Sequence, residues 1–422
     1  MPILLGAIAD DFTGATDLCS MLVRNGMRAV QLIGVPEAGL AMPEADAVVV
    51  ALKSRTAPVA AAVAESLAAQ RWLAGQGARQ YLFKYCSTFD STDTGNIGPV
   101  ADALLDAVGS DFTIVCPAFP EAGRTIFKGH LFVGDLLLSD THMRHHPLTP
   151  MTDANLVRVL GRQTSRGVGL VAFDTVRRGP DAIRARFAEL RAAGCVYAVT
   201  DVLEDEDLRR LGAACSDLVL LTGGSGIAMG LPDNFRRAGA LAEGSAADAL
   251  PTVAGAEAVL AGSCSAATLE QVAAMAAVRP TLRLDLERLA AGWSPGEAVQ
   301  WARAHLGDGP VLIYASAAAE EVRAVQERLG RDRAGALVED ALAEIARGLV
   351  DAGVRRLLVA GGETSGAVVQ ALGVKGLAVG PMIDPGVPAT VSIGTAPQLA
   401  LVLKSGNFGA RDLFTRAFSC MP

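Results

Sequence analysis

Short apolar runs alternate with longer amphipathic segments along the whole chain. The first run, Ile3 to Ile8, is nearly continuous, and an amphipathic segment carrying Leu18, Met21 and Leu22 follows it. Such a run predicts a strand buried on both faces, as in a parallel sheet covered by helices. Six further strands are expected within residues 45–54, 80–87, 112–119, 167–175, 195–202 and 217–226. This rhythm predicts a doubly wound α/β domain with a mostly parallel sheet.

A second series of the same kind occupies the rest of the chain. Its strands are expected within residues 258–268, 281–287, 310–316, 355–361, 386–393 and 399–404. A stretch rich in Gly, Ala and Pro, without clear periodicity, separates the two series. We therefore expect two domains, residues 1–240 and 241–422. Two α/β domains joined by a linker imply an interdomain cleft, a favoured location for a small-molecule site.

Composition narrows the function classes. The formal charge of −8 offers no basic field for nucleic acid, so no nucleic-acid partner is expected. No apolar stretch is long enough to suggest a membrane span, and the amino terminus lacks a basic region typical of signal peptides. The seven cysteines include no C-x-x-C pair, which favours reduced thiols and a cytoplasmic location. A homo-oligomer is compatible with the sequence.

Two adjacent carboxylates, Asp10 and Asp11, end the first apolar run, and Asp17 follows. Open α/β sheets bind ligands at the carboxyl ends of their strands. A helix cap would explain one acid, whereas two repel each other unless a ligand or cation accepts them. Both acids are candidate catalytic residues. Because side chains alternate along a strand, we expect Asp11 to face the cleft and Asp10 to hold the helix start.

Other polar groups follow strand ends of the first domain. The Arg55 fork suits a substrate carboxylate, and the loop with Lys84, Ser87 and Asp90 suits a hydroxyl-rich chain. A solvated Ser/Thr/Asp loop is the alternative reading. Further candidate substrate-binding residues are Arg124 and Gly224.

Glycine-rich turns are the candidate phosphate-binding elements of the second domain. At Gly361, Gly362, Glu363 and Thr364 a buried strand meets a helix, so backbone N–H groups converge as phosphate binding requires. Comparable turns occur around Ser263 and Gly406. Any doubly wound fold needs such turns, but three in one domain favour a triphosphate site. The chain lacks both G-x-x-x-x-G-K-[ST] and an opening G-x-G-x-x-G, which excludes a P-loop and disfavours a dinucleotide site.

Long stretches in both halves resemble the four-carbon acid sugar kinases, specifically the 3-oxo-tetronate kinase branch. They are IADDFTGATD, FKYCSTFDSTDTGNIGP, PAFPEAGRTIFKGHLFVG, HPLTPMTDANL, LTGGSGIAMGLP, VAGGETSGAVV and LKSGNFG. The resemblance extends from residue 3 to about residue 415.

This resemblance implies ATP-dependent phosphorylation of the terminal hydroxyl of a 3-oxo-tetronate, with Mg²⁺ bridging phosphate oxygens. It implies that the first domain binds the sugar acid and that Ser263, Gly361–Thr364 and Gly406 contact ATP. Two alternatives remain open at this point. The substrate could be a reduced relative, threonate or erythronate, or the protein could bind sugar acids without turnover.

Overall fold

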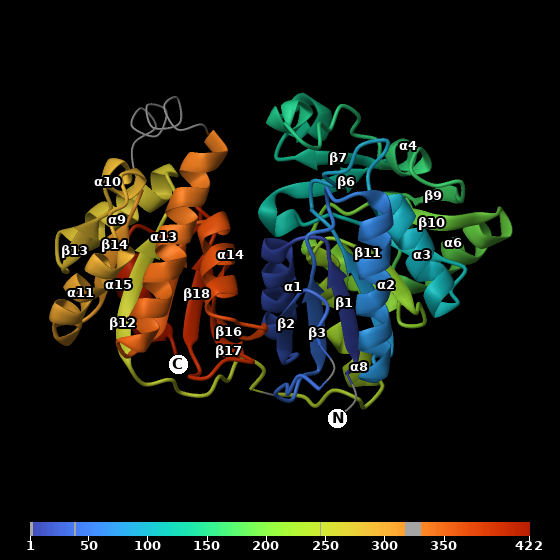
Figure 1. Ribbon diagram of the computed structural model, residues 1–422. Helices are drawn as coiled ribbons and strands as arrows, with labels where there is room; N and C mark the ends of the chain where they lie inside the picture. The colour runs from blue at the N-terminus through green and yellow to red at the C-terminus, as the bar shows by residue number, and fades with distance from the viewer. Residues whose placement is uncertain (1–2, 38, 245, 317–330) are drawn as a thin grey trace. The chain divides into compact units, whose positions relative to one another are not determined.

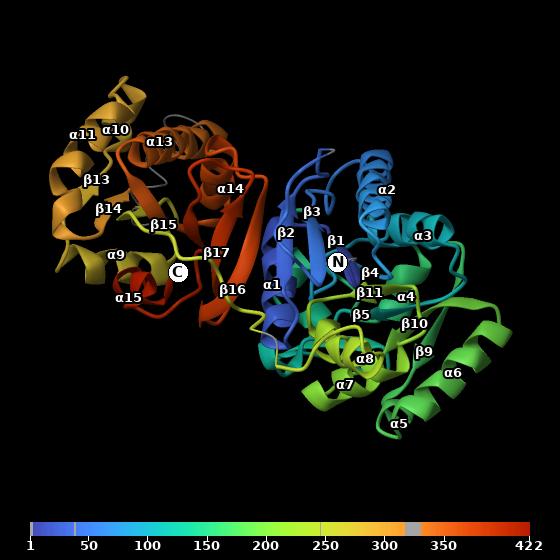
Figure 2. The ribbon, with the colours of Figure 1, turned by 90° about the horizontal axis from the view of Figure 1, so that it is seen from below.

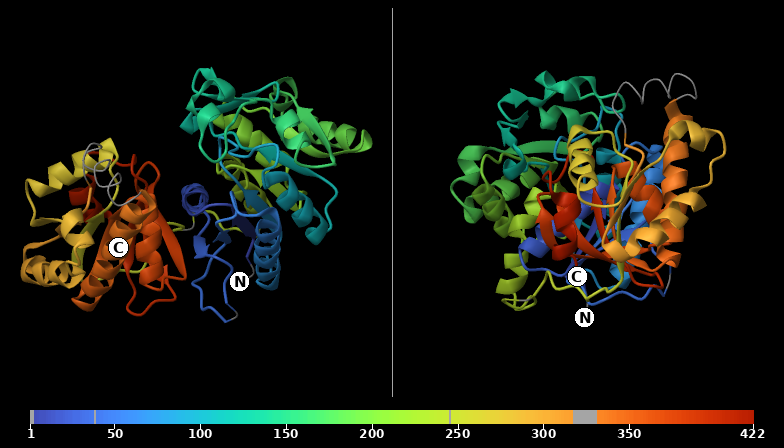
Figure 3. Two further views of the ribbon diagram at one scale, coloured as in Figure 1. Left: turned by 45° about the horizontal axis from the view of Figure 1, so that its top comes forward. Right: turned by 90° about the vertical axis from the view of Figure 1, so that its left-hand side faces the viewer.

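The computed structural model describes residues 3–37, 39–244, 246–316 and 331–422. The chain divides into two compact units, Met1–Asp248 and Ala249–Pro422. The boundary expected near residue 240 lies close to this division. Blue to green marks the first unit and yellow to red the second in Figure 1 and in the further views of Figure 3.

The large sheet of the first unit is parallel throughout the described strands. Each strand is short, and the central strands Leu5–Ala9, Ala47–Ala51 and Gln80–Lys84 are fully buried, as the apolar runs predict, whereas the edge strand Gly167–Val171 is only partly buried. In spatial order the strands are β2 (Ala29–Ile33), β3 (Ala47–Ala51), β1 (Leu5–Ala9), β4 (Gln80–Lys84), β11 (Leu220–Gly223), β5 (Thr113–Cys116), β10 (Cys195–Thr200) and β9 (Gly167–Val171).

Helices cover both faces of this sheet (Figure 2). On one face lie α1 (Phe12–Arg24), α6 (Pro180–Ala192) and α7 (Asp205–Ala214), and on the other α2 (Val59–Gly75) and α3 (Ile97–Val108). Shorter helices are α4 (Leu156–Gly161), α5 (Phe173–Val176) and α8 (Pro232–Arg237). Burial on both faces explains why the strands are apolar runs rather than alternating ones.

A small antiparallel sheet of β6 (Arg124–Phe127), β7 (His130–Val133) and β8 (Leu136–Leu137) lies at the carboxyl end of the large one (Figure 1). A bridge between Ile126 and Val202 fixes it beside the end of β10. The buried Asp201 carboxylate also accepts backbone N–H groups of Lys128, Gly129 and Phe173 at 2.8–2.9 Å. The small sheet is therefore anchored near the strand ends.

The second unit has a mostly parallel sheet with two antiparallel strands at one side. Its order is β13 (Thr281–Arg283), β14 (Val311–Tyr314), β12 (Ala256–Ala261), β15 (Val354–Ala360), β18 (Ala400–Lys404), β17 (Val387–Ile393) and β16 (Gly376–Asp384). The doubly wound α/β architecture expected for both domains is confirmed.

Helices also sandwich this sheet (Figure 2). One side carries α11 (Pro295–His305), α13 (Arg331–Asp351) and α14 (Gly362–Ala371), and the other α9 (Ala266–Ala276) and α15 (Leu413–Cys420), with α10 (Leu286–Ala290) at the margin. An apolar core joins α9 and α15 to the sheet through buried side chains such as Met275, Phe414 and Val402. Among the described helices of the chain, none is both long and apolar enough to cross a membrane.

Candidate functional site

The strand order of the first unit reverses around β1. From β1 the chain builds β2 and β3 on one side, then returns to form β4 on the other. Doubly wound sheets bind ligands outside the carboxyl ends of the strands at such a point. The groups placed there are Asp10 and Asp11 after β1, Arg55 after β3, and Lys84 at the end of β4.

The Arg55 guanidinium is surrounded by carboxylates. Its Nε and Nη2 donate to Oδ2 and Oδ1 of Asp10, both at 2.9 Å. Nη2 also lies 2.9 Å from Asp11 Oδ1, and Nη1 lies 3.7 Å from Asp90 Oδ2. Burial raises the pKa of the Asp10 carboxyl, and the Arg55 hydrogen bonds and charge oppose that rise. The role of Arg55 toward a substrate carboxylate stays a prediction, since the fork is already engaged by Asp10.

Asp10 and Asp11 have different roles from those expected from the sequence. Asp11 Oδ1 accepts the backbone N–H of Gly14 at 3.0 Å and caps α1, so the expectation that Asp10 holds the helix start is wrong. The physical reason is that β1 ends at Ala9, and the alternation of side chains along a strand does not extend into the turn. Asp11 is also the more accessible acid, because its side chain is 31% exposed. Its Oδ2 accepts no hydrogen bond from any residue in the described ranges.

Lys84 projects its amine over the first turn of α1. A Cβ added to Gly14 would lie 2.1 Å from Lys84 Nζ and 2.3 Å from Asp11 Oδ1, so a larger residue here would displace both groups. Lys84 is 4% exposed, and its Nζ lies 3.9 Å from Asp11 Oδ1. Burial and the missing side chain of Gly14 therefore bring an ammonium group and the Asp11 carboxylate together.

The loop after β4 is held in an unusual conformation. Phe89 and Asp90 have φ angles of 65° and 46°, a region that non-glycine residues seldom adopt. The buried Phe89 ring packs edge-on against Tyr85 at 5.5 Å, and Thr88 donates to Asp90 Oδ1 at 2.7 Å. Strain of this kind persists where the surroundings fix one shape, which favours a binding loop over a solvated one.

Asn96 ties this loop to the Arg55 segment. Its side-chain amide donates to the carbonyl oxygens of Ser54 and Ala57 at 2.7 and 2.8 Å, and lies 3.3 Å from that of Arg55. Sequence reasoning did not single out Asn96. An asparagine ending a Ser/Thr/Asp loop just before a helix was the available signal.

The remaining candidate substrate-binding residues of the first unit are Ser87, Arg124 and Gly224. Ser87 is half-buried, and its hydroxyl makes no hydrogen bond within the described chain. Arg124 begins β6, and its charge lowers the pKa of Asp17, although burial raises that pKa more. Gly224 has a packing reason to be glycine, because a Cβ would lie 2.7 Å from Pro117 O. Their contacts with substrate stay predictions.

A hollow of about 220 Å³ adjoins the loop that follows β4. Ser91 N–H points at the Met151 sulfur at 3.4 Å, which joins the loop to the HPLTPMTD segment. Hydroxyl and carboxylate side chains dominate its lining, which consists of Ser91, Thr92, Asp93, Thr94, Pro150, Met151, Thr152, Asp153 and Val159. This polar hollow suits a small hydroxylated molecule.

Three turns of the second unit meet at neighbouring strand ends, because β15 lies between β12 and β18. A Cβ on Gly361 would lie 2.9 Å from Thr364 Oγ1 and 3.2 Å from Ser263 N. A Cβ on Gly406 would lie 2.5 Å from Ser263 Oγ. The residues predicted to contact ATP are thus brought together.

The first turn of α14 is open. Gly361 precedes the helix with a φ of 129°, and no side chain caps the helix. A Cβ on Gly362 would meet nothing within 4 Å, and Glu363 is exposed. Uncapped N–H groups at a helix start attract anions.

The buried Lys404 side chain forms hydrogen bonds that hold the Gly406 turn. The side chain is 1% exposed, and Nζ donates to Thr268 Oγ1, Gln271 Oε1 and Gly406 O at 2.7–2.9 Å. Burial lowers the pKa of Lys404 to about 8. Its contacts indicate a role in shaping the Gly406 turn.

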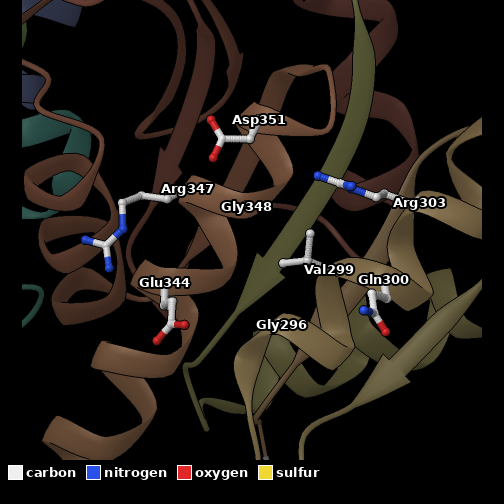
Figure 4. A pocket seen from close by; sticks show the side chains of 8 residues that line it. All are labelled: Gly296, Val299, Gln300, Arg303, Glu344, Arg347, Gly348 and Asp351. Atoms are coloured by element: carbon white, nitrogen blue, oxygen red, sulfur yellow. The ribbon is translucent and has the colours of Figure 1, made fainter.

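Another hollow of the second unit, about 460 Å³, lies between α11 and α13 and holds none of the predicted site residues (Figure 4). Its charged side chains, Arg303, Glu344, Arg347 and Asp351, are exposed. Close packing of Gly348 against Val299 explains how the helices meet beneath it.

Family comparisons divide the chain in the same way. A family model described as "Sugar-binding N-terminal domain" matches residues 5–231, and one described as "Nucleotide-binding C-terminal domain" matches residues 258–414. The chain is 64% identical over 417 residues to the 3-oxo-tetronate kinase of Pseudomonas fluorescens, covering 98% of this chain and 96% of the relative. The 3-oxo-tetronate kinase of Burkholderia multivorans is 62% identical over 419 residues, covering 99% and 97%.

Solved structures give the same picture of the fold. A Salmonella typhimurium LT2 chain described as a tRNA synthase superposes with a TM-score of 0.90 at 42% identity, covering 99% of both chains. A Haemophilus influenzae protein of the DUF1537 family superposes with a TM-score of 0.89 at 43% identity, covering 99% of this chain and 100% of that one.

Proposed function

The chain belongs to the 3-oxo-tetronate kinase family, and from that premise we propose that it transfers the γ-phosphoryl group of ATP to the terminal hydroxyl of 3-oxo-tetronate. The products are ADP and 3-oxo-tetronate 4-phosphate. The first unit binds the sugar acid and the second binds ATP. A cytoplasmic location fits the seven free cysteines and the need for ATP.

One observation carries the assignment of ATP to the second unit. The turns after β12, β15 and β18 converge on the uncapped start of α14, with Gly362 facing open space. Backbone N–H groups and the positive helix end suit phosphate oxygens. Ser263, Gly361–Thr364 and Gly406 are the proposed ATP contacts.

In the first unit, Asp11 is the proposed acceptor of the hydroxyl proton. Its half-buried carboxylate has an oxygen, Oδ2, that accepts no hydrogen bond from the described residues, and its other oxygen is fixed by the cap on α1. The O–H bond breaks toward Asp11, the hydroxyl oxygen bonds to phosphorus, and the bond from phosphorus to the β,γ-bridging oxygen breaks, leaving its electrons on ADP. Asp10 orients Arg55 instead of touching substrate, and Asn96 holds the Arg55 segment.

The nucleotide would bind as its Mg²⁺ complex. No group of three His, Cys, Asp or Glu side chains suited to a metal occurs in the part of the chain that is described. Mg²⁺ in nucleotide sites needs only one or two carboxylates beside phosphates and water. Glu363, the carboxylate of the first turn of α14, fits that need, and the bound metal would neutralise phosphate charge.

Gly362→Val is expected to raise the KM for ATP about tenfold or more, because its side chain would cover N–H donors that bind phosphate. The KM for the sugar acid should not change, and the open space around Gly362 allows the variant to fold. Steady-state kinetics with each substrate varied in turn measures both constants. Gly366→Val, one turn later on the same helix and also in open space, is the matched control. Equal effects of the two variants on the KM for ATP would contradict a phosphate site at Gly362.

Two other readings are distinguishable. A threonate or erythronate kinase would differ only in the few hydrogen bonds that separate a carbonyl from a hydroxyl. A sugar-acid binding protein without turnover would release no ADP when mixed with MgATP and 3-oxo-tetronate. The name tRNA synthase is not carried over, because the net charge of −8 offers no field for RNA.

A further inference from the structure

Two buried lysines occupy equivalent places at strand ends but have opposite surroundings. Lys404, at the end of β18, donates to three oxygen atoms within 2.9 Å. Lys84, at the end of β4, is 4% exposed, and its Nζ makes no hydrogen bond with any residue the structure describes. Asp11 Oδ1, at 3.9 Å, is too far for a hydrogen bond, and a buried ammonium without hydrogen-bond acceptors is costly. Lys404 therefore has a structural role, whereas Lys84 lacks the oxygen atoms that a bound ligand would supply.

The start of α1 adds to the positive charge at Lys84. Nζ lies over the first turn of this 13-residue helix, in the space that the missing Gly14 side chain leaves. The helix end carries a positive partial charge, which the Asp11 cap offsets only in part, so the ammonium adjoins a second, weaker positive group. An anion placed there would interact favourably with both groups, and the benefit grows with the charge of the anion.

The position of Asp11 indicates whether the anion beside Lys84 is the substrate carboxylate or the transferred phosphoryl group. Its Oδ1 lies 3.9 Å from Lys84 Nζ. The proposed proton acceptor and the ammonium group can therefore contact the same part of a bound substrate. The oxygen that gives its proton to Asp11 is the one that bonds to phosphorus. The carboxylate of a four-carbon acid lies at the opposite end of its carbon chain. The group beside Lys84 is therefore the transferred phosphoryl group.

We propose that Lys84, together with the start of α1, binds the phosphoryl group as it reaches the acceptor hydroxyl and then the phosphate of the product, and does not bind the substrate carboxylate. This assignment rests on the proposed kinase function. Gly14 is the residue that makes room for the ammonium. Arg55, paired with Asp10, cannot replace Lys84 in this role because both its Nε and Nη2 are engaged.

Lys84→Met in the full-length protein tests the assignment. We expect kcat to fall by about 10² to 10³ because charge stabilisation at the phosphoryl group is lost. The Kd of 3-oxo-tetronate without nucleotide, measured by calorimetry, should stay unchanged, whereas that of 3-oxo-tetronate 4-phosphate should weaken about tenfold or more. The melting temperature is measured only as a check on folding, because Lys84 also faces the carboxylates of Asp11 and the largely buried Asp17. Lys84→Gln is the second variant, and Lys128→Met, an exposed lysine of the same unit, is the control.

Equal weakening of the acid and its phosphate in the Lys84 variants would place the carboxylate at Lys84 and overturn the proposal. Unchanged kcat and unchanged product affinity would overturn it as well. Wild-type protein that releases no ADP with MgATP and the acid would instead refute the proposed function, before any variant is compared.

Discussion

Replacing Asp11 by asparagine is expected to lower kcat by about 10² to 10⁴ with little change in stability. The amide cannot accept the hydroxyl proton, yet Asn caps a helix about as well as Asp, so the bond to Gly14 N–H is retained. Stopped assays of ADP release give kcat, and thermal unfolding gives the stability. The separation of these two effects is what distinguishes a proton acceptor from a cap.

A matched control exists in the second unit. Asp285 caps α10 through the N–H groups of Glu287 and Arg288, so Asp285→Asn makes the same chemical change at a cap outside the proposed site. It should leave kcat as it is. If Asp11→Asn also keeps wild-type turnover, Asp11 is a cap alone and the proton acceptor must be sought elsewhere.

Asp10→Asn is expected to destabilise the protein by about 3 to 5 kcal/mol, because it breaks a buried ion pair and leaves Arg55 with less compensation. Both carboxylate oxygens of Asp10 bind the guanidinium at 2.9 Å, and Asp10 is 4% exposed. Chemical denaturation of the full-length chain, read by probes in the first unit, measures the loss.

Glu44→Gln serves as the control for this change. Glu44 pairs with Arg28 at 2.7 Å, but its side chain is 65% exposed. Such surface pairs contribute about 0 to 1 kcal/mol. A loss at Asp10 no greater than that at Glu44 would show that the buried pair does not hold the strand ends together.

The apolar runs predicted most of the strands, because a strand buried on both faces is apolar at nearly every position and can be recognised from the sequence. The strands they missed have a physical explanation. β2 includes Gln31, a fully buried polar residue that accepts a hydrogen bond from Thr16 at 2.8 Å. β16 contains Gly380 and Pro381, which weaken strand propensity, and β8 has only two residues. Tertiary contacts rather than local pattern form these strands.

The sequence indicated which side chains of the first unit lie close together, but not which contacts they make. Strand ends placed Asp10, Arg55 and Lys84 at one edge, as parallel pairing requires. Which acid would cap α1 depended on β1 ending at Ala9, and element ends are poorly fixed by sequence. The packing reason for Gly224 depends on Pro117, a residue distant in sequence, and no local pattern could show it.

The most direct test is a coupled assay of ADP release by the wild-type protein with MgATP and a panel of four-carbon acids: 3-oxo-tetronate, threonate and erythronate. The account predicts the highest kcat/KM for 3-oxo-tetronate and phosphate only on its terminal hydroxyl. A higher kcat/KM for threonate or erythronate, or no ADP release with any of the acids, would contradict it.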